Sequence, residues 1–217
     1  MLNMFILSGL FLALFAVGEA AYHLLKIQAE YTRKIVHVGT GILTMLFPVM
    51  LDSHWYVLCL CASFWLILQL SLKYGFLKSI NAIDRSSSGS VLYPVIVYLM
   101  FCFYVWLGTY KMYFYLPILT MAFCDPAAAL AGKKYGVKKY HIGYDTKSYI
   151  GSFAFFAISV PLSLACLWFT FGYLSSHFLF LALLIAFVSS FAEAVSGKGS
   201  DNFSIPCSVA FILYIYL

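Results

Sequence analysis

Apolar runs long enough to cross a lipid bilayer recur along the whole of this chain. Of its 217 residues, 64% are hydrophobic and only 10% are charged. A helix needs about 20 consecutive apolar residues to span the roughly 30 Å of hydrocarbon in a bilayer. Inside that layer every backbone polar group must be satisfied within the protein, which a helix achieves. The sequence therefore predicts an all-α fold, a polytopic membrane helix bundle, with one integral domain over residues 1–217 and no sizeable soluble domain.

The apolar runs predict about eight membrane-spanning helices. The second and the last are short, so the count is seven to eight, and the last run could instead lie in the interface. We expect the helices at residues 2–22, 35–51, 54–72, 90–108, 112–131, 150–171, 178–196 and 203–217. All six cysteines fall inside these runs, and we interpret them as packing residues, with neither a disulfide nor a metal site implied.

Lysine and arginine residues are distributed unevenly between the predicted helices. Of the thirteen, Lys111 alone falls on one side of the membrane, and the other twelve fall on the opposite side. Positive residues are enriched in cytoplasmic loops. The twelve should therefore face the cytoplasm, and with eight spans both termini should lie outside. The net charge of +5 reflects this topology, because nucleic-acid binding would need a soluble basic surface that the chain lacks.

Several acidic residues lie near the predicted cytoplasmic face, among them Glu19, Asp125, Glu193 and Asp201. A charged group deep in a bilayer costs about 2.5–3.5 kcal/mol on insertion scales. Asp125 and Glu193 therefore need partners or a watery cavity, and we interpret them as functional. The alternative is a salt bridge or an interhelical hydrogen bond that only stabilises the bundle. Glu193, Asp201 and Asn202 also supply the hard oxygen ligands that a divalent cation prefers, with helix capping as the alternative role of the last two.

The stretch DPAAALAGKKYG places a carboxylate, small residues and cations together. Asp followed by Pro is typical of a helix start with the acid as N-cap, so we expect the fifth span to break near Asp125. Such a break is tolerated where the backbone lines a polar cavity. Beyond it we expect a flexible basic turn formed by Gly132, Lys133, Lys134 and Gly136. A carboxylate for a divalent cation beside lysines for phosphates is what a nucleotide–metal complex requires.

Two predicted helix starts on the same face share a pattern. In RSSSGSVLYP a cation precedes Gly-Ser by four residues, and KSYIGSFAFF repeats the interval. Helix N-termini present free amides and a positive dipole end to anions, and glycine permits close approach. We therefore expect phosphate binding there, while a snorkelling cation beside Gly-Ser packing is the alternative. The residues concerned are Arg85, Gly89, Ser90, Lys147, Ser148, Gly151 and Ser152.

The segment EYTRKIVHVGTG places Arg33 and His37 four residues apart, on one helical face. Arg33 and the adjacent Lys34 can bind phosphate, and the imidazole of His37 can hydrogen-bond or move a proton. A hydrogen-bonded packing role is the alternative for His37.

Taken together, five blocks resemble the polyprenol kinase family of membrane enzymes, which includes phytol, dolichol and CTP-dependent diacylglycerol kinases. The blocks are RKIVHVGTG, GSVLYP, DPAAALAGKKYG, KSYIGS and the series from Glu193 through Asp201-Asn202 to Pro206, in the family's order over residues 33–206. The resemblance implies Mg²⁺-dependent transfer of the terminal phosphoryl group of CTP, or of another nucleoside triphosphate such as ATP. The acceptor would be the hydroxyl of a membrane lipid alcohol, and phytol, farnesol, polyprenol and diacylglycerol all fit.

The family's motifs match this chain residue by residue. The pattern D-x-x-A-x-x-x-G is matched by Asp125, Ala128 and Gly132. K-S-x-x-G-S is matched by Lys147, Ser148, Gly151 and Ser152, and D-N-x-x-x-P by Asp201, Asn202 and Pro206. There are two departures. Many phytol-kinase-like members have glycines on both sides of the aspartate and an arginine where this chain has Lys133, which keeps the charge but loses the bidentate fork.

The residues and the resemblance together predict an active site on the cytoplasmic face, around residues 23–37, 73–94, 123–152 and 193–206. Asp125 with Glu193, Asp201 or Asn202 is expected to hold Mg²⁺, and Lys147 with the other cations to hold the nucleotide phosphates. Either Asp125 or His37 would deprotonate the alcohol. A phosphatidate cytidylyltransferase is the nearest rival, and a small transporter that couples ions through Asp125 and Glu193 is a remote one. The oligomeric state is left open.

Overall fold

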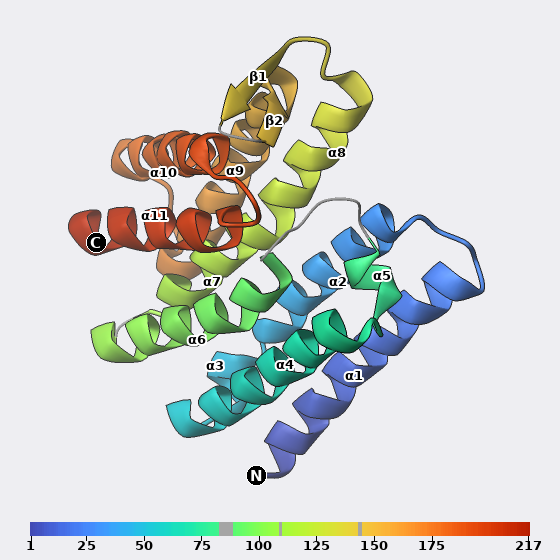
Figure 1. The fold of residues 1–217 in the computed structure, drawn as a ribbon. Coiled ribbons are helices and arrows are strands. Elements are labelled where there is room, and N and C mark those ends of the chain that lie inside the picture. Colours follow the sequence, from blue (N-terminus) through green and yellow to red (C-terminus); the bar gives the residue numbers. More distant parts are fainter. Residues whose placement is uncertain (83–88, 109, 143–144) are drawn as a thin grey trace.

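The computed structural model describes residues 1–82, 89–108, 110–142 and 145–217, which are almost entirely helical (Figure 1). The helices of the first half are α1 (Leu2–His23), α2 (Ala29–Thr44), α3 (Phe47–Met50), α4 (His54–Tyr74), α5 (Lys78–Asn81) and α6 (Gly89–Leu107). Those of the second half are α7 (Met112–Leu119), the π-helical turn η1 (Thr120–Cys124), α8 (Asp125–Tyr135), α9 (Tyr149–Phe171), α10 (Ser176–Val195) and α11 (Asp201–Tyr216). The predicted polytopic helical bundle is confirmed.

The structure supports six membrane spans, fewer than the predicted seven to eight. Among the described residues, six helical stretches are long and apolar enough to cross a bilayer: Leu2–His23, His54–Tyr74, Gly89–Leu107, Met112–Tyr135, Tyr149–Phe171 and Ser176–Val195. The two short predicted spans correspond to α2 and α11, which have 16 residues each. At a rise of 1.5 Å per residue such a helix is about 24 Å long, shorter than the hydrocarbon layer. The predicted span 35–51 is also interrupted by a turn after Thr44.

The helix that carries Asp125 lies at the centre of the bundle. In the apolar window of Met112–Tyr135, 61% of the residues are buried, compared with 22% for Leu2–His23. On one side it packs against α2 and α6, and on the other against α9 and α11. Figure 1 shows it between the N-terminal helices α1 to α6 and the C-terminal helices α9 to α11. Residues on this central helix can therefore face a site formed by both halves of the chain.

The predicted break at Asp125 is wrong in its details. The helix passes from α7 into α8 through η1, and Asp125 has helical dihedrals (φ −63°, ψ −50°), so it is not an N-cap. The physical reason is Pro126, which lacks an N–H and clashes with the preceding turn; a single π-helical turn absorbs this without ending the helix. The predicted flexible basic turn is also wrong, because Lys133 and Lys134 lie in the last turn of α8.

A small antiparallel hairpin, not predicted from the sequence, precedes α9. Strand β1 (Lys139–Ile142) pairs with β2 (Asp145–Ser148), and Tyr140 lies opposite Lys147. Ser148 ends the second strand and caps α9, because its Oγ accepts the N–H of Gly151 at 3.0 Å. The hairpin therefore fixes where Lys147 stands relative to the start of α9.

Candidate active site

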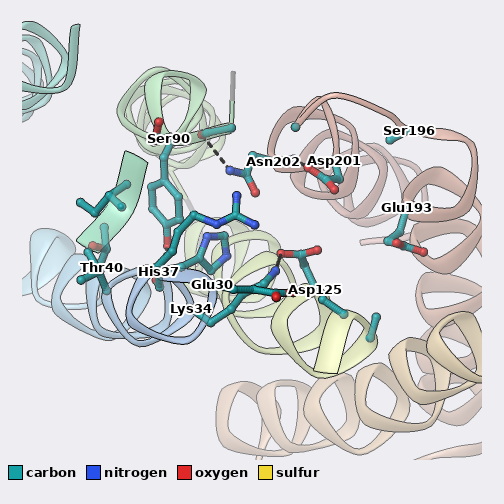
Figure 2. A pocket seen from close by; sticks show the side chains of 18 of the residues that line it. Glu30, Lys34, His37, Thr40, Ser90, Asp125, Glu193, Ser196, Asp201 and Asn202 are labelled. Atoms are coloured by element: carbon teal, nitrogen blue, oxygen red, sulfur yellow. Dashed lines mark hydrogen bonds and ion pairs between the residues drawn. The ribbon is translucent and has the colours of Figure 1, made fainter. Parts of the chain in front are cut away.

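Most of the predicted site residues line one cavity of about 380 Å³. We call its polar end the polar chamber and define it by Arg33, Lys34, His37, Asp125, Lys147, Glu193, Asp201 and Asn202, all of which line the cavity. Figure 2 shows Lys34, His37 and Asp125 on one side of it, Asp201 and Asn202 on the facing side, and Glu193 further along. Four segments that are far apart in the sequence therefore meet in this chamber.

Asp125 is held by a buried ion pair with Lys34. The Nζ of Lys34 donates to Oδ2 of Asp125 at 2.8 Å, and each residue is 8% exposed. A buried charge needs such a partner, and removing either member of the pair leaves the other uncompensated. The carboxylate comes from the first turn of α8 and the lysine from α2, so the pair also joins the central helix to the N-terminal half.

Lys147 and Glu193 form a second, partly buried ion pair on the far side of the chamber. The Nζ of Lys147 donates to Oε1 of Glu193 at 2.7 Å, and it also donates to the backbone carbonyl of Glu193. The side chains are 14% and 9% exposed. This pair joins β2 to the end of α10. Lys34 and Lys147, two of the lysines predicted to bind phosphate, therefore each contact a carboxylate in this structure.

His37 is fixed from two sides. Its Nε2 donates to the carbonyl of Met121 at 3.2 Å, and its ring meets that of Tyr93 edge-on, with the ring centroids 4.9 Å apart. Tyr93 also donates its hydroxyl to the backbone carbonyl of His37 at 3.2 Å. Helix α2 approaches η1 closely because residue 41 is glycine: a Cβ there would lie 2.3 Å from the Cβ of Ala122.

Pro126 explains why the carbonyl of Met121 accepts from His37. In a π-helical pattern the carbonyl of residue i accepts from the N–H of residue i+5, which for Met121 is residue 126. Pro126 has no N–H to offer. A carbonyl only accepts, so Nε2 of His37 carries the proton and Nδ1 keeps a lone pair that can take one. The proline that was predicted to break the helix thus orients the histidine.

The start of α11 brings two more oxygen ligands to the chamber. The Nδ2 of Asn202 donates to the carbonyl of Gly89 at 2.8 Å, which ties the first turn of α11 to the first residue of α6. The backbone N–H of Asn202 donates to Oδ1 of Asp201 at 3.0 Å. Asp201 precedes the apolar part of α11 and lies outside the six spanning helices; burial, together with the Asp125 carboxylate, raises the pKa of Asp201. A cation between these two acids would relieve that repulsion.

Gly132 of α8 and Gly151 at the start of α9 serve helix packing. A Cβ at Gly132 would lie 2.7 Å from Oγ of Ser148, and one at Gly151 would lie 2.9 Å from the carbonyl of Ala128. Their missing side chains let α8 and α9 approach closely, which is the packing alternative of the sequence analysis. Gly132, Ser148, Gly151 and Ser152 still line the cavity, as do Gly89 and Ser90 at the start of α6.

Some predicted site residues lie apart from the chamber. Lys134 and Gly136 do not line the cavity, and Arg85 lies outside the residues that the structure describes. Glu19 accepts the backbone N–H of Ser79 at 2.8 Å and therefore has a packing role. Lys133 lines the cavity at its exposed rim, where it forms an ion pair with Glu30.

The chamber fits a magnesium ion only as part of a nucleotide complex. Within the described residues, no three His, Cys, Asp or Glu side chains come together as a group that could hold a metal ion. Mg²⁺ in nucleotide sites is usually bound through one or two carboxylates together with substrate phosphates and water. Asp125 and Asp201, which face the same cavity, can supply those carboxylates.

Sequence reasoning missed two residues that shape the chamber. Tyr93, in the GSVLYP block, orients His37 as described above. Asp145 accepts the backbone N–H of Lys198, and a Cβ at Gly197 would lie 2.6 Å from its Oδ2, so Asp145 holds the loop before α11.

A comparison with curated proteins found a similar chain. A phytol kinase from Synechocystis sp. (strain ATCC 27184 / PCC 6803 / Kazusa) is 30% identical over 192 residues, which cover 86% of this chain and 79% of that protein. No protein-family model matches the chain. No solved structure matches it either.

Proposed function

Because this chain belongs to the polyprenol and phytol kinase-like family of membrane lipid kinases, we propose that it phosphorylates a membrane lipid alcohol. The donor in this proposal is a nucleoside triphosphate, CTP first and ATP second, and the acceptor is the alcohol hydroxyl. The chain is an integral membrane protein, so its acceptor can reach the site from the bilayer. We propose that the polar chamber faces the cytoplasm, because Lys34, Lys133 and Lys147 all line the cavity and lysine and arginine are enriched on the cytoplasmic side of membrane proteins.

The observation that carries the proposal is the composition of the polar chamber. It combines two lysines that are at most 14% exposed in their side chains, carboxylates, and a histidine whose Nδ1 keeps a lone pair, all in one cavity. Phosphoryl transfer depends mainly on positioning and on neutralising the phosphate charge. Lys34 and Lys147 would exchange their carboxylate partners for phosphate oxygens, which also accept charge-assisted hydrogen bonds. Arg33 and the rim residue Lys133 would add positive charge around the nucleotide.

Asp125, Asp201, Asn202 and Glu193 are the residues that would hold Mg²⁺ on the nucleotide phosphates. When bound, this ion would neutralise the charge on the transferring phosphoryl group. When the phosphates bind to Lys34 and Lys147, the carboxylates of Asp125 and Glu193 lose their lysine partners and would face Mg²⁺ instead. This exchange of partners keeps every buried charge compensated, as a low-dielectric site requires.

The alcohol hydroxyl would lose its proton to His37 or to Asp125. His37 has the better geometry in this structure, because Met121 fixes its tautomer and leaves Nδ1 as an acceptor. Asp125 is paired with Lys34 here and becomes available as a base only if that lysine moves to a phosphate. The proton leaves the hydroxyl as its oxygen attacks the γ-phosphorus, and the bond from that phosphorus to the bridging oxygen of the nucleoside diphosphate breaks.

The test is a panel of alcohols offered to purified protein in detergent. Geraniol, farnesol, geranylgeraniol, phytol, a short polyprenol and diacylglycerol would each be incubated with Mg²⁺ and either CTP or ATP, and the lipid product identified by mass spectrometry. We expect an alcohol monophosphate. A lipid linked to cytidine monophosphate, formed from phosphatidate as an additional substrate, would instead identify a cytidylyltransferase. No lipid product from any combination would contradict the kinase proposal.

A further inference from the structure

The cavity extends from the polar chamber into a second, apolar region. We call this the apolar arm and define it by Phe11, Phe15, Phe47, Cys61, Phe64 and Val97, which all line the cavity. All six are at most 7% exposed, so the arm is enclosed by the N-terminal half of the bundle. None of these side chains carries a nitrogen or an oxygen. These six side chains therefore offer a hydrocarbon surface to a ligand.

The arm leads away from the chamber and has a closed end. Arg33 and Thr44 of α2 both line the cavity, and eleven residues of helix correspond to about 16 Å along its axis. Phe47, at the start of α3, lies beyond Thr44, and its ring meets those of Phe11 at 5.9 Å and Phe114 at 6.4 Å between centroids. This aromatic cluster closes the end that lies furthest from Asp125.

Cys61 lies near that closed end. It belongs to the second turn of α4, and α4 begins only four residues after α3 ends. Phe64, one turn further along α4, meets Phe11 and Phe15 at 5.2 and 5.6 Å between ring centroids. Cys61 is thus a small side chain that lines the arm together with the bulky rings of Phe47 and Phe64. The space beside a small side chain is where the end of a long apolar ligand can fit.

We propose that the apolar arm binds the hydrocarbon tail of the lipid alcohol and that Cys61, with Phe47 behind it, sets the longest tail accepted. This inference rests on the proposed function and adds the part of the site that selects the substrate. The tail extends from the hydroxyl in the polar chamber toward Phe47. Because the large apolar side chains of the lining come from α1 to α6 on one side of the chamber, the site accepts one tail. An alcohol with a single chain fits it better than a diacylglycerol does.

The matched pair of variants is Cys61→Phe and Cys59→Phe. Both cysteines are on α4, but Cys61 is buried in the arm and Cys59 is exposed on the outside of the bundle. We expect Cys61→Phe to lower kcat/KM for geranylgeraniol relative to geraniol by about tenfold or more, as steric exclusion of a tail segment does. Cys59→Phe should leave that ratio within about twofold of the wild-type value. An unchanged ratio in Cys61→Phe, or an equal change in both variants, would overturn the inference.

A second measurement does not depend on turnover or on the variants folding. Wild-type protein would be irradiated with farnesol carrying a diazirine at the tail end, and the labelled peptides would be identified by mass spectrometry. We expect labels on the segments containing Phe11, Phe47 and Cys61, with competition by unlabelled farnesol. Labels confined to exposed, lipid-facing residues such as Trp55 or Phe187 would overturn the tail site. If the labels are confined to lipid-facing residues but the protein still phosphorylates alcohols, only the tail site is contradicted. If the labels lie in the arm but no alcohol is phosphorylated, only the kinase proposal is contradicted.

Discussion

The polar chamber takes its charged groups from both halves of the chain, whereas the six side chains that define the apolar arm come from α1, α3, α4 and α6. In the chamber, Lys34 meets Asp125 across 91 residues of sequence and Lys147 meets Glu193 across 46. In the arm, the lining consists of apolar side chains from neighbouring helices. The difference indicates a division of labour: the chamber would carry the chemistry and the arm the choice of tail. Variants in the chamber should then change turnover for every alcohol by the same factor.

Of the variants considered, the replacement of Asp125 should have the largest effect. Its result would also show whether the division of labour between the chamber and the arm is wrong. We expect Asp125→Asn to lower kcat at least about 100-fold, equally for geraniol and geranylgeraniol. The single variant also leaves Lys34 buried without its partner, which by itself destabilises the fold. The double variant Lys34→Met with Asp125→Asn removes that unpaired charge, and it should recover thermal stability without recovering turnover.

Initial rates with both alcohols and the unfolding midpoint in detergent measure these expectations. Near-normal turnover in the double variant would show that Asp125 only compensates Lys34. A loss confined to the longer alcohol would show that the chamber and the arm are not separate.

Replacing Lys147 should raise the nucleotide KM by about tenfold or more, because a charge-assisted hydrogen bond contributes about 1.5–3 kcal/mol. Lys147→Met is the variant, and Lys138→Met, an exposed lysine before the same hairpin, is the matched control. The KM for the alcohol should not change in either. A higher KM for the alcohol with an unchanged KM for the nucleotide would show that Lys147 contacts the alcohol and not the nucleotide.

Restoring an N–H at position 126 should have a moderate effect through His37. In Pro126→Ala the new N–H can compete with His37 for the carbonyl of Met121, and losing one such hydrogen bond corresponds to about two- to tenfold in kcat. A double-mutant cycle provides the readout: in a His37→Ala background, Pro126→Ala should lower kcat no further. Additive losses in the cycle would mean that Pro126 does not act by positioning His37.

Lys133→Met should have the smallest effect, about twofold or less on the nucleotide KM. Its side chain is 47% exposed at the rim, where ion pairs contribute little and salt screens them. Measuring KM at low and at high ionic strength tests this, because the difference from wild type should shrink as salt is added. A large effect that persists at high salt would place Lys133 within the polar chamber.

The chamber could largely be predicted from the sequence because charges are costly in a bilayer and therefore stand out. The cluster around Asp125, Glu193 and Asp201 was expected on that ground, and the cavity brings these residues together. The individual ion pairs were not predicted, because sequence spacing does not show which lysine reaches which acid. The effect of Pro126 was misjudged for a related reason: an acid followed by proline is typical of a helix start, but here the same pair follows a π-helical turn inside a continuous helix.

The apolar arm could not be predicted at all. Phe11, Cys61 and Val97 differ in no sequence pattern from the lipid-facing residues beside them, and only the packing of α4 against α1 and α6 decides which of them line a cavity. The predicted number of spans was wrong for a similar reason, because α2 and α11 are apolar enough over part of their length but only 16 residues long. Length and packing, rather than composition, fix both features.

The most direct test of the account follows the γ-phosphorus of the nucleotide. Wild-type protein and Asp125→Asn would be given an accepted alcohol with CTP or ATP labelled at either the γ- or the α-phosphorus, and the extracted lipid would be counted. The account predicts that γ-label enters the lipid with release of the nucleoside diphosphate, that α-label does not, and that the variant transfers neither. Entry of α-label with release of pyrophosphate, or γ-transfer that persists without Asp125, would contradict it.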